Sequence, residues 1–427
     1  MNEDFLHFIW KFKLFDKHNL QTTDGESVQI ISVGLQNNCS GADFTNARIK
    51  IGNTEWVGNV EIHLKSSDWI QHKHHMDATY NNVILHVVEQ DNARITTKNG
   101  NIIPTLILKY DPLLEKRHKQ LLTSPIAIPC QPSLKNIDLF LVRHFLSRVL
   151  VERLERKSND IIQTLGNAKN NWHNAFYQLL FRSFGFGTNA LPFQMLAKHT
   201  PMRIVEKYCD NIFQIEALLF GQAGFLEEVP QDDYQQKLKA EYFFLKTTYN
   251  LSPIDKSMWK FGRLHPANFP TIRIAQLSKL VSSMNNIIEQ MLNFTLPKEL
   301  FAVFTADVSK YWEQHYDFGK GSVKQVKPLG KKSIEKLIVN VVAPFLFIYG
   351  KQNANNTMQD KALALLDTLP AESNSIIDMW KNAGIKADNA FYSQALIQLK
   401  LNYCDKKTCL MCAIGKNIIE KEQLKTF

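Results

Sequence analysis

The stretch TEWVGNVEIHLKSSDW, residues 54–69, decides the fold of the N-terminal part of this chain. Residues 54–65 predict a β-strand, because Val60, Ile62 and Leu64 face one side of an extended backbone and the residues between them face the other. Two serines follow as N-cap candidates, which predicts a helix over residues 66–82. Gly52 and Asn53 stand directly before the strand and predict a turn.

The flanking segments of the N-terminal part follow from hydrophobic periodicity. A helical spacing of apolar residues alternates with short β-type runs and turn residues. The predicted segments are a helix over 3–15, strands over 27–35, 47–51 and 83–88, and a hairpin over 93–110. The order of elements is therefore helix, three strands, helix and strand, which is an α+β fold.

A proline-rich stretch separates this part from a helical remainder. Pro125, Pro129 and Pro132 fall within LLTSPIAIPCQPSL, and prolines at this density cannot continue a helix. Nearly every later segment has helical periodicity. We therefore predict an α+β domain over residues 1–122, a linker over 123–135 and an all-helical domain over 136–427.

Composition limits the class of protein. The 427 residues are 44% hydrophobic and 21% charged, which excludes a disordered or fibrous chain. The net charge of +9 favours a polyanionic partner. The longest apolar run, residues 337–350, is shorter than the roughly 20 residues of a membrane span, and the N-terminus does not resemble a signal peptide. We expect a cytoplasmic protein with no membrane contact.

Two acidic residues lie where neighbouring strands would bring them together. Asp43 opens the second strand, and Glu61 lies on the third with His63 and Lys65 on the same face. Two carboxylates with waters and phosphate oxygens suit Mg²⁺ or Mn²⁺, which would activate a water for hydrolysis. A strict two-residue turn would place the acids on opposite faces, so this site requires a longer turn or a β-bulge, which we place at Gly58.

The element order and the acids together resemble the core of the PD-(D/E)XK nucleases. In those enzymes an Asp on the second strand and a Glu on the third bind a divalent metal, and a Lys follows two residues after the Glu. The resemblance implies Asp43 and Glu61 as metal ligands, with His63 in the lysine position. The resemblance extends to further supporting catalytic residues at Lys65, Glu3, Asp77 and Tyr80.

Departures from the nuclease pattern leave other functions open. Ala42 replaces the Pro of the motif, and a His in place of its Lys alters or abolishes the mechanism. The first function is a metal-dependent nuclease or phosphodiesterase acting on DNA or RNA. The alternatives are a non-catalytic nucleic-acid- or protein-binding scaffold on a degenerate nuclease core, and a zinc hydrolase using the histidine-rich segment 72–86.

The C-terminal segment contains three closely spaced cysteines. Cys404, Cys409 and Cys412 form a C-x4-C-x2-C pattern, which suits a zinc ion or an iron–sulfur cluster once a fourth thiolate joins. The fourth ligand would come from Cys39, Cys130 or Cys209, and a resemblance to RecB-like nucleases with an iron–sulfur cluster favours the early Cys39. Buried or free thiols without metal are the alternative.

Two strings of the helical part stand out by their polarity. WKFGRLHPANFPTIRIAQL, residues 259–277, offers Arg263, His265 and Arg273 as nucleic-acid contacts, or as residues that brace a loop between helices. FGFGTNALPF, residues 184–193, predicts a helix end and restart and has no P-loop lysine.

The chain as a whole resembles a family of bacterial proteins catalogued as domain of unknown function 2851. The resemblance runs nearly end to end, and it implies no established activity. The strings that carry it are EDFLHFIWKFKLF, GNVEIHLKSSDW, NNVILHVV, FRSFGFGTNALPF, WKFGRLHPANFPTIRIAQL and CLMCAIG.

Overall fold

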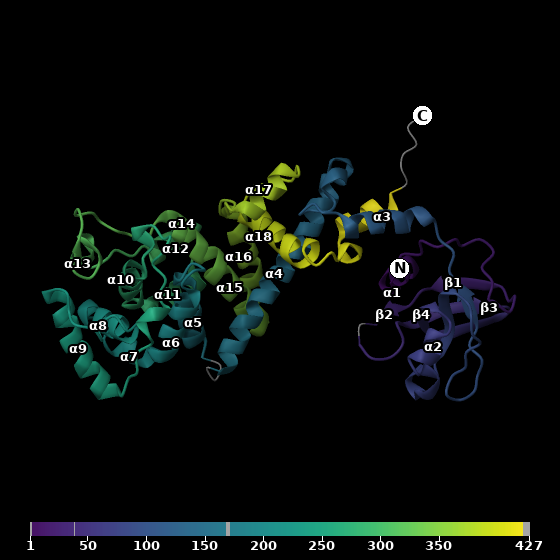
Figure 1. Ribbon diagram of the computed structural model, residues 1–427, viewed down its shortest axis with the longest axis horizontal. Helices are drawn as coiled ribbons and strands as arrows, with labels where there is room; N and C mark the ends of the chain where they lie inside the picture. The colour runs from purple at the N-terminus through teal and green to yellow at the C-terminus, as the bar shows by residue number, and fades with distance from the viewer. Residues whose placement is uncertain (1, 38, 168–170, 422–427) are drawn as a thin grey trace. The chain divides into compact units, whose positions relative to one another are not determined.

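The computed structural model describes residues 2–37, 39–167 and 171–421, which form two compact units. Unit 1 contains the described residues among 2–145, 379–385 and 399–421, and unit 2 contains those among 146–378 and 386–398. The last part of the chain thus returns to the unit that holds the N-terminal part. Figure 1 labels the elements of both units.

Unit 1 is built on a six-stranded mixed sheet with the order β1-β3-β4-β5-β6, in which the short β2 also pairs with β3. β1, β3 and β4 are antiparallel, and β5 and β6 continue the sheet in parallel with β4. The α+β prediction is confirmed (Figure 1). The strands are β1 (Val28–Ser32), β2 (Leu35–Gln36), β3 (Phe44–Ile51), β4 (Thr54–Lys65), β5 (Val83–Gln90) and β6 (Thr105–Ile107).

A β-bulge on β3 sets the register of the two acid-bearing strands. Ile51 pairs with Thr54 across a two-residue turn, whereas Phe44 pairs with Val60 and Ala47 with Gly58. β3 therefore carries one residue more than β4 over this interval, and Asn46 adopts a φ of 55° within it. The prediction that a bulge is needed is confirmed. Its placement at Gly58 was wrong, because Asn tolerates the left-handed conformation on the facing strand.

The single helix predicted over residues 66–82 was wrong. The segment forms one turn of α2 (Asp68–Gln71) and two 3-10 turns, η1 (His74–Met76) and η2 (Ala78–Tyr80). Lys73 takes a φ of 63°, which ends the helical path after α2. The Asp77 carboxylate accepts a hydrogen bond from the Thr79 N–H at 2.9 Å and starts η2 as a cap.

Apolar residues fix the first helix and the segment after β4. α1 (Glu3–Lys11) buries Phe5, Phe8, Ile9 and Trp10 among others and packs against β4. It is shorter than the predicted 3–15, because Lys13 has a φ of 52°. A second cluster contains Ala42, Trp69, Tyr80, Val83, Ile95 and Ile103. Trp69 and Tyr80 anchor the short turns that carry the histidines.

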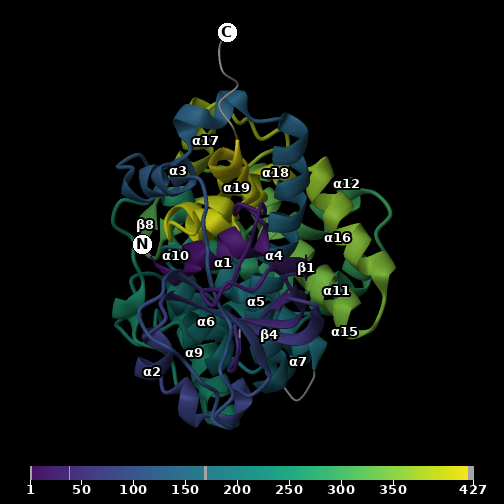
Figure 2. The same ribbon diagram turned by 90° about the vertical axis from the view of Figure 1, so that its right-hand side faces the viewer.

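The C-terminal part of unit 1 packs on α3 (Pro112–Thr123). The Arg117 guanidinium donates to the carbonyl of Ile419 at 3.0 Å, and Lys407 donates to the carbonyl of Leu122. Figure 2 shows α3 beside α19, which it contacts. The remaining elements here are η3 (Gln131–Asn136), η7 (Lys400–Cys404), η8 (Cys409–Met411) and α19 (Ala413–Glu420).

Unit 2 is largely helical, which confirms the second half of the fold prediction. One small hairpin joins β7 (His315–Asp317) to β8 (Lys320–Gly321). Helices α4 and α17 continue into unit 1. The helices are α4 (Leu139–Asn167), α5 (Trp172–Phe184), α6 (Ala190–His199), α7 (Met202–Lys207), α8 (Ile212–Gln222), α9 (Asp233–Tyr249), η4 (Lys256–Met258), η5 (Pro266–Asn268), α10 (Pro270–Val281), α11 (Met284–Asn293), α12 (Pro297–Phe304), α13 (Lys310–Glu313), α14 (Lys331–Leu337), η6 (Ile338–Val342), α15 (Ala343–Gln352), α16 (Asn356–Thr368), α17 (Ser375–Asn382) and α18 (Ala390–Leu399).

One continuous helical stretch in unit 2 is long and apolar enough to cross a membrane by length and composition alone. It runs from Lys331 to Gln352 through α14, η6 and α15. Within its most apolar window, 72% is buried inside the protein. That burial is the property of a core helix.

Candidate metal centre

Asp43 and Glu61 lie side by side across β3 and β4. The Asp43 N–H donates to Glu61 Oε2 at 3.0 Å, and the Ile62 N–H donates to Asp43 Oδ2 at 2.9 Å. Glu61 is 4% exposed. Burial, and then the charge of Asp43, raise the pKa of Glu61 to about 9. A cation beside this carboxyl would favour its ionised form.

Two histidines lie near the second carboxylate oxygen of Glu61, and a third histidine contacts one of them. Glu61 Oε1 lies 3.3 Å from His74 Nε2 and 3.6 Å from His63 Nε2. His63 Nε2 in turn lies 3.1 Å from His72 Nδ1. His63 projects from β4, whereas His72 and His74 flank the left-handed Lys73. One nitrogen from each of the three imidazoles lies within 4.8 Å of the other two.

These separations match the edges of a metal coordination shell. Ligands about 2.1 Å from one ion are about 3.0 Å apart when cis in an octahedron and about 3.4 Å apart in a tetrahedron. The separations between His63 and His72, between Glu61 and His74 and between Glu61 and His63 run from 3.1 to 3.6 Å. The donor set of one carboxylate and three imidazoles is characteristic of a first-row transition ion.

His86 contacts His63 from the neighbouring strand. His86 Nε2 on β5 lies 2.9 Å from His63 Nδ1. Burial, followed by the neighbouring imidazoles, lowers the pKa of both histidines to about 3. Both rings are therefore neutral near pH 7, which is the form that binds a metal. The contact with His86 fixes the orientation of the His63 ring, and metal-binding histidines commonly have such a partner.

α1 contributes a second layer of polar side chains. His7 Nε2 lies 3.2 Å from Asp43 Oδ2. Burial opposes protonation of His7, but the hydrogen bond and charge of Asp43 outweigh it, so the pKa of His7 is raised. Glu3, one turn earlier, has its pKa raised by burial, while His72 opposes the shift and Asp43 adds to it. Sequence reasoning named Glu3 but missed His7, which the i, i+4 spacing from Glu3 places on the same helix face.

The remaining predicted residues occupy different positions around the centre. The Tyr80 ring lies 3.9 Å from the His74 ring, and burial followed by the charge of Glu61 raises the pKa of Tyr80 to about 12. Lys65 is exposed at the end of β4, where its N–H donates to Asp68. The Asp77 side chain is exposed and caps η2.

Solvent has a route to the candidate centre. His72 is exposed, His74 is half-buried, and the Asp43 side chain retains 23% of its exposure. Glu61 and His63 form the buried floor beneath them. A substrate could therefore approach from the side of His72 and Asp43 without unfolding the sheet.

Four cysteines gather in the C-terminal part of unit 1. Cys409 and Cys412 flank η8 and are buried, Cys404 ends η7, and Cys130 is a buried cap of η3. Burial and the thiols of Cys412 and Cys409 raise the pKa of Cys130 to about 12. Burial, and then the thiols of Cys130, Cys412 and Cys409, also raise the pKa of Cys404, so Cys130, one of the three candidates for the fourth ligand, lies near the C-terminal cysteines.

The residues predicted to contact nucleic acid lie in unit 2 in different environments. Arg263 is exposed and has a φ of 62°. The exposed His265 accepts from the Ala267 N–H at 3.3 Å and caps η5. Arg273 is buried in α10. His265 thus caps the short η5 turn before α10, and the role of the three residues in nucleic-acid contact stays a prediction.

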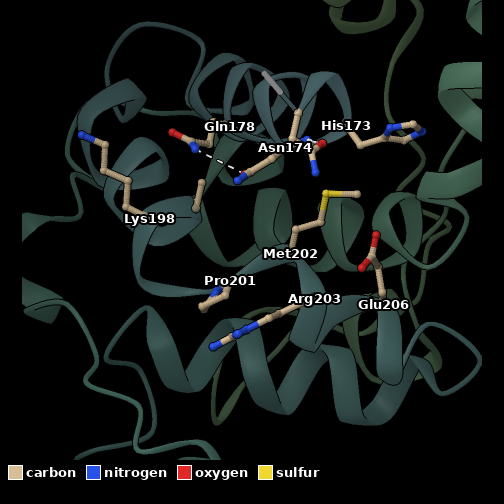
Figure 3. Close-up of a pocket in the computed structure, with 10 residues that line it drawn as sticks. His173, Asn174, Gln178, Lys198, Pro201, Met202, Arg203 and Glu206 are labelled. Atoms are coloured by element: carbon tan, nitrogen blue, oxygen red, sulfur yellow. Dashed lines mark hydrogen bonds between the residues drawn. The ribbon is translucent and has the colours of Figure 1, made fainter. Parts of the chain in front are cut away.

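A further groove in unit 2 lies between α5 and the α6–α7 segment (Figure 3). Its volume is about 560 Å³. Figure 3 shows His173, Lys198, Arg203 and Glu206 around it. The groove therefore carries charges of both signs and no cluster of catalytic groups.

A family model described as protein of unknown function (DUF2851) matches residues 3–375. The chain belongs to this family. No curated protein and no solved structure matches the chain. The range matched to the DUF2851 family includes every residue of the candidate metal centre and Cys130, and it ends before the three C-terminal cysteines.

Proposed function

We propose that this protein is a divalent-metal-dependent phosphodiester hydrolase that acts on DNA or RNA. The ion would be held by Glu61, His63, His72 and His74, with Asp43 beside it. The observation that carries the proposal is the set of 3.1–3.6 Å separations among these donors around a solvent-accessible opening.

The donor set also selects among the metals expected from the sequence. Two carboxylates alone suit Mg²⁺ or Mn²⁺, but three imidazoles favour a softer ion than Mg²⁺. Of the two ions expected from the sequence, Mg²⁺ and Mn²⁺, we therefore propose Mn²⁺. Zinc is the alternative if the three histidines, and not the carboxylates, determine which metal binds. The basic surplus of the chain supports a nucleic-acid substrate.

The nuclease assignment rests on the likeness to PD-(D/E)XK enzymes. An acid directly before β3 and an acid on the adjacent β4 meet through a bulge, and a proton-handling group follows the second acid by two residues. In this chain that group is His63, which contacts Glu61. His63 thus stands where the nucleases have a catalytic lysine, and we propose that it binds the metal instead. Of the two acids, Asp43 keeps 23% of its side-chain exposure, whereas Glu61 is buried.

The chain's own residues would divide the chemistry among them. A bound ion would polarise the phosphodiester and lower the pKa of an attacking water. Asp43 would accept the proton of that water, because its carboxylate is the more exposed of the two acids. His7, whose pKa the hydrogen bond and charge of Asp43 raise, would donate a proton to the leaving oxygen.

The test is cleavage of single- and double-stranded DNA and RNA by the full chain with Mn²⁺, Mg²⁺ or Zn²⁺. Glu61→Gln should lower the rate at least 100-fold, and Glu55→Gln on the exposed end of the same strand should leave it unchanged. Equal rates for wild type and Glu61→Gln would refute the metal role. Nucleic-acid binding without cleavage in any metal would favour the non-catalytic scaffold instead.

We also propose a second, structural metal centre formed by Cys130, Cys404, Cys409 and Cys412. Gly415 supports it, because a side chain there would collide with the carbonyl oxygen of Cys409 and open the turn. Among the described residues, no trio of these sulfurs lies within 4.8 Å, whereas sulfurs around one zinc are about 3.8 Å apart. An iron–sulfur cluster, whose ligands bind different iron atoms, suits the wider spacing.

The cysteine centre is tested by metal analysis and absorption spectra of protein purified without oxygen. Cys130→Ser should remove the bound iron and the visible absorption, whereas Cys39→Ser should retain both. Retention of the metal in Cys130→Ser would refute this ligand set, and zinc in place of iron would refute the cluster. Thiols that bind metal need a reducing compartment, so we propose a cytoplasmic location.

A further inference from the structure

A positively charged pocket in unit 2 joins the two polar strings of the helical part. It has a volume of about 360 Å³ and lies where the loop after α5 meets the start of α10 and the first turns of α14. The Asn189 amide pairs in both directions with the backbone of Lys260 at 2.9 Å, which ties the strings together. Polar and aromatic lining residues include Phe186, Asn189, Asn268, Arg273, Lys332 and Lys336.

Arg273 is the buried cation of this pocket, and it is 7% exposed. Its Nη2 donates to Asn268 Oδ1 at 2.6 Å and to Ser333 Oγ at 3.2 Å, and its Nη1 donates to Gln276 Oε1 at 3.0 Å. The guanidinium lies 4.4 Å from the centre of the Phe186 ring. All of these partners are neutral, and Nε has no hydrogen-bond partner.

The pocket has no counter-anion for this buried charge among the described residues that line it. Its lining contains Arg273, Lys332 and Lys336 but no Asp or Glu. Burial alone lowers the pKa of Arg273 to about 10, so the guanidinium is still charged near neutral pH. A buried cation without an anionic partner is unfavourable, and a bound anion would offset the cost of removing it from water.

The two lysines extend the positive charge to the rim. Lys332 and Lys336 are exposed and lie one turn apart on α14. Like charges at i, i+4 repel each other, and an anion between them would relieve the repulsion. The buried Arg and the exposed lysines thus face one cavity whose volume exceeds that of an inorganic ion and falls in the range of small-molecule sites.

We propose that this pocket binds a phosphate monoester, with Arg273 at its base and Lys332 and Lys336 at its rim. The phosphate would belong either to a free mononucleotide or to the 5′ end of a nucleic-acid strand, since both present the same dianion. Phe186, Asn189 and Asn268 would then contact the group that carries the phosphate. The proposal depends on residues of unit 2 only and does not require the metal centre.

The experiment is calorimetric titration of the full chain in EDTA, which removes metal from the candidate centre. The probes are inorganic phosphate, adenosine 5′-monophosphate, adenosine, and one oligonucleotide with a 5′-phosphate or a 5′-hydroxyl. We expect the 5′-phosphate to increase affinity at least tenfold over its matched partner. Binding of the mononucleotide identifies a free ligand, and binding of the phosphorylated strand alone identifies a strand end.

Variants assign the binding to the pocket. The double change Lys332→Gln, Lys336→Gln alters only exposed residues and should weaken binding at least tenfold, whereas Lys331→Gln, an exposed neighbour outside the lining, should change it less than twofold. Arg273→Lys should abolish binding, and the rim variants decide if it does not fold. Three results would overturn the proposal. They are equal affinity for probes with and without phosphate, equal losses of affinity in the double variant and in Lys331→Gln, and no binding of any probe at millimolar concentration.

Discussion

Replacing Glu61 with Gln should stabilise the metal-free protein and destabilise the metal-bound one. The buried carboxyl has a pKa raised from 4.5 to about 9, so the folded state favours its protonated form. The stability that this form gives is fully present below pH 4.5 and is lost progressively as the pH rises to about 9. Gln is neutral at every pH and keeps an oxygen that can accept from the Asp43 N–H.

The size of the effect follows from the shift. At 1.36 kcal/mol per pH unit, wild-type protein loses about 3 kcal/mol between pH 4.5 and pH 7, and the Gln variant does not. In chelator at pH 7, that difference predicts about 100-fold slower hydrogen exchange of the β4 amides in the variant. Free Mn²⁺ at about a hundred times its dissociation constant should add about 2.7 kcal/mol to the wild type and much less to the variant.

The assay is hydrogen–deuterium exchange of the full chain, read by mass spectrometry on peptides that cover β4. Glu55→Gln is the matched control, because Glu55 lies on the same strand with its side chain 40% exposed. It should change exchange little in either buffer. Faster exchange of Glu61→Gln than of wild type in chelator at pH 7, or equal protection of both proteins by Mn²⁺, would refute the reasoning.

Three further changes test the ligand set and the register that builds it. His74→Ala should weaken Mn²⁺ binding in a calorimetric titration about 10- to 100-fold. His75→Ala, which changes a histidine outside the cluster, should leave the affinity unchanged. Equal losses of affinity in the two variants would show that His74 is not a ligand. Asn46→Val should lower the free energy of unfolding by about 1–3 kcal/mol in urea titrations, because a β-branched residue is strained at a φ of 55°. An unchanged unfolding midpoint would contradict the bulge. Gly58→Ala should lower the free energy of unfolding by about 1–3 kcal/mol in the same assay, because the new Cβ would lie 2.7 Å from the carbonyl oxygen of Asn82. An unchanged free energy of unfolding would contradict the close approach of β4 and β5.

The sheet could be predicted because its strands carry simple patterns. The alternation of Val60, Ile62 and Leu64 with polar residues fixes β4, and the apolar run at Val83 fixes β5. The bulge could be anticipated from the need to bring two acids together, but its position could not. Asn46 takes a left-handed backbone only in the context of the pairing of β3 with β4.

The histidine cluster was hidden by the wrong helix. A continuous helix over 66–82 would have spread His72 and His74 around its axis. The left-handed Lys73 instead turns His74 toward Glu61 and His72 toward His63. His86 lies within an apolar strand, and its partner His63 lies on a neighbouring strand that only the sheet order identifies. Local periodicity carries no information about such contacts.

The fourth cysteine shows the same limit. Sequence spacing connects Cys404, Cys409 and Cys412, but it gives no reason to choose Cys130 over Cys39 or Cys209. The choice depends on how the C-terminal segment packs on the part of the chain near α3, where Arg117 contacts Ile419 and Cys130 lies near the late cysteines. Long-range packing of this kind is decided by tertiary contacts, not by propensity.

The most direct test of the metal centre is a crystal of the full chain soaked in Mn²⁺ and measured for anomalous scattering. The account predicts one strong peak about 2.0–2.3 Å from Glu61 Oε1 and from nitrogens of His63, His72 and His74. A peak elsewhere in unit 1, or no peak at this position at a saturating concentration of the ion, would contradict it.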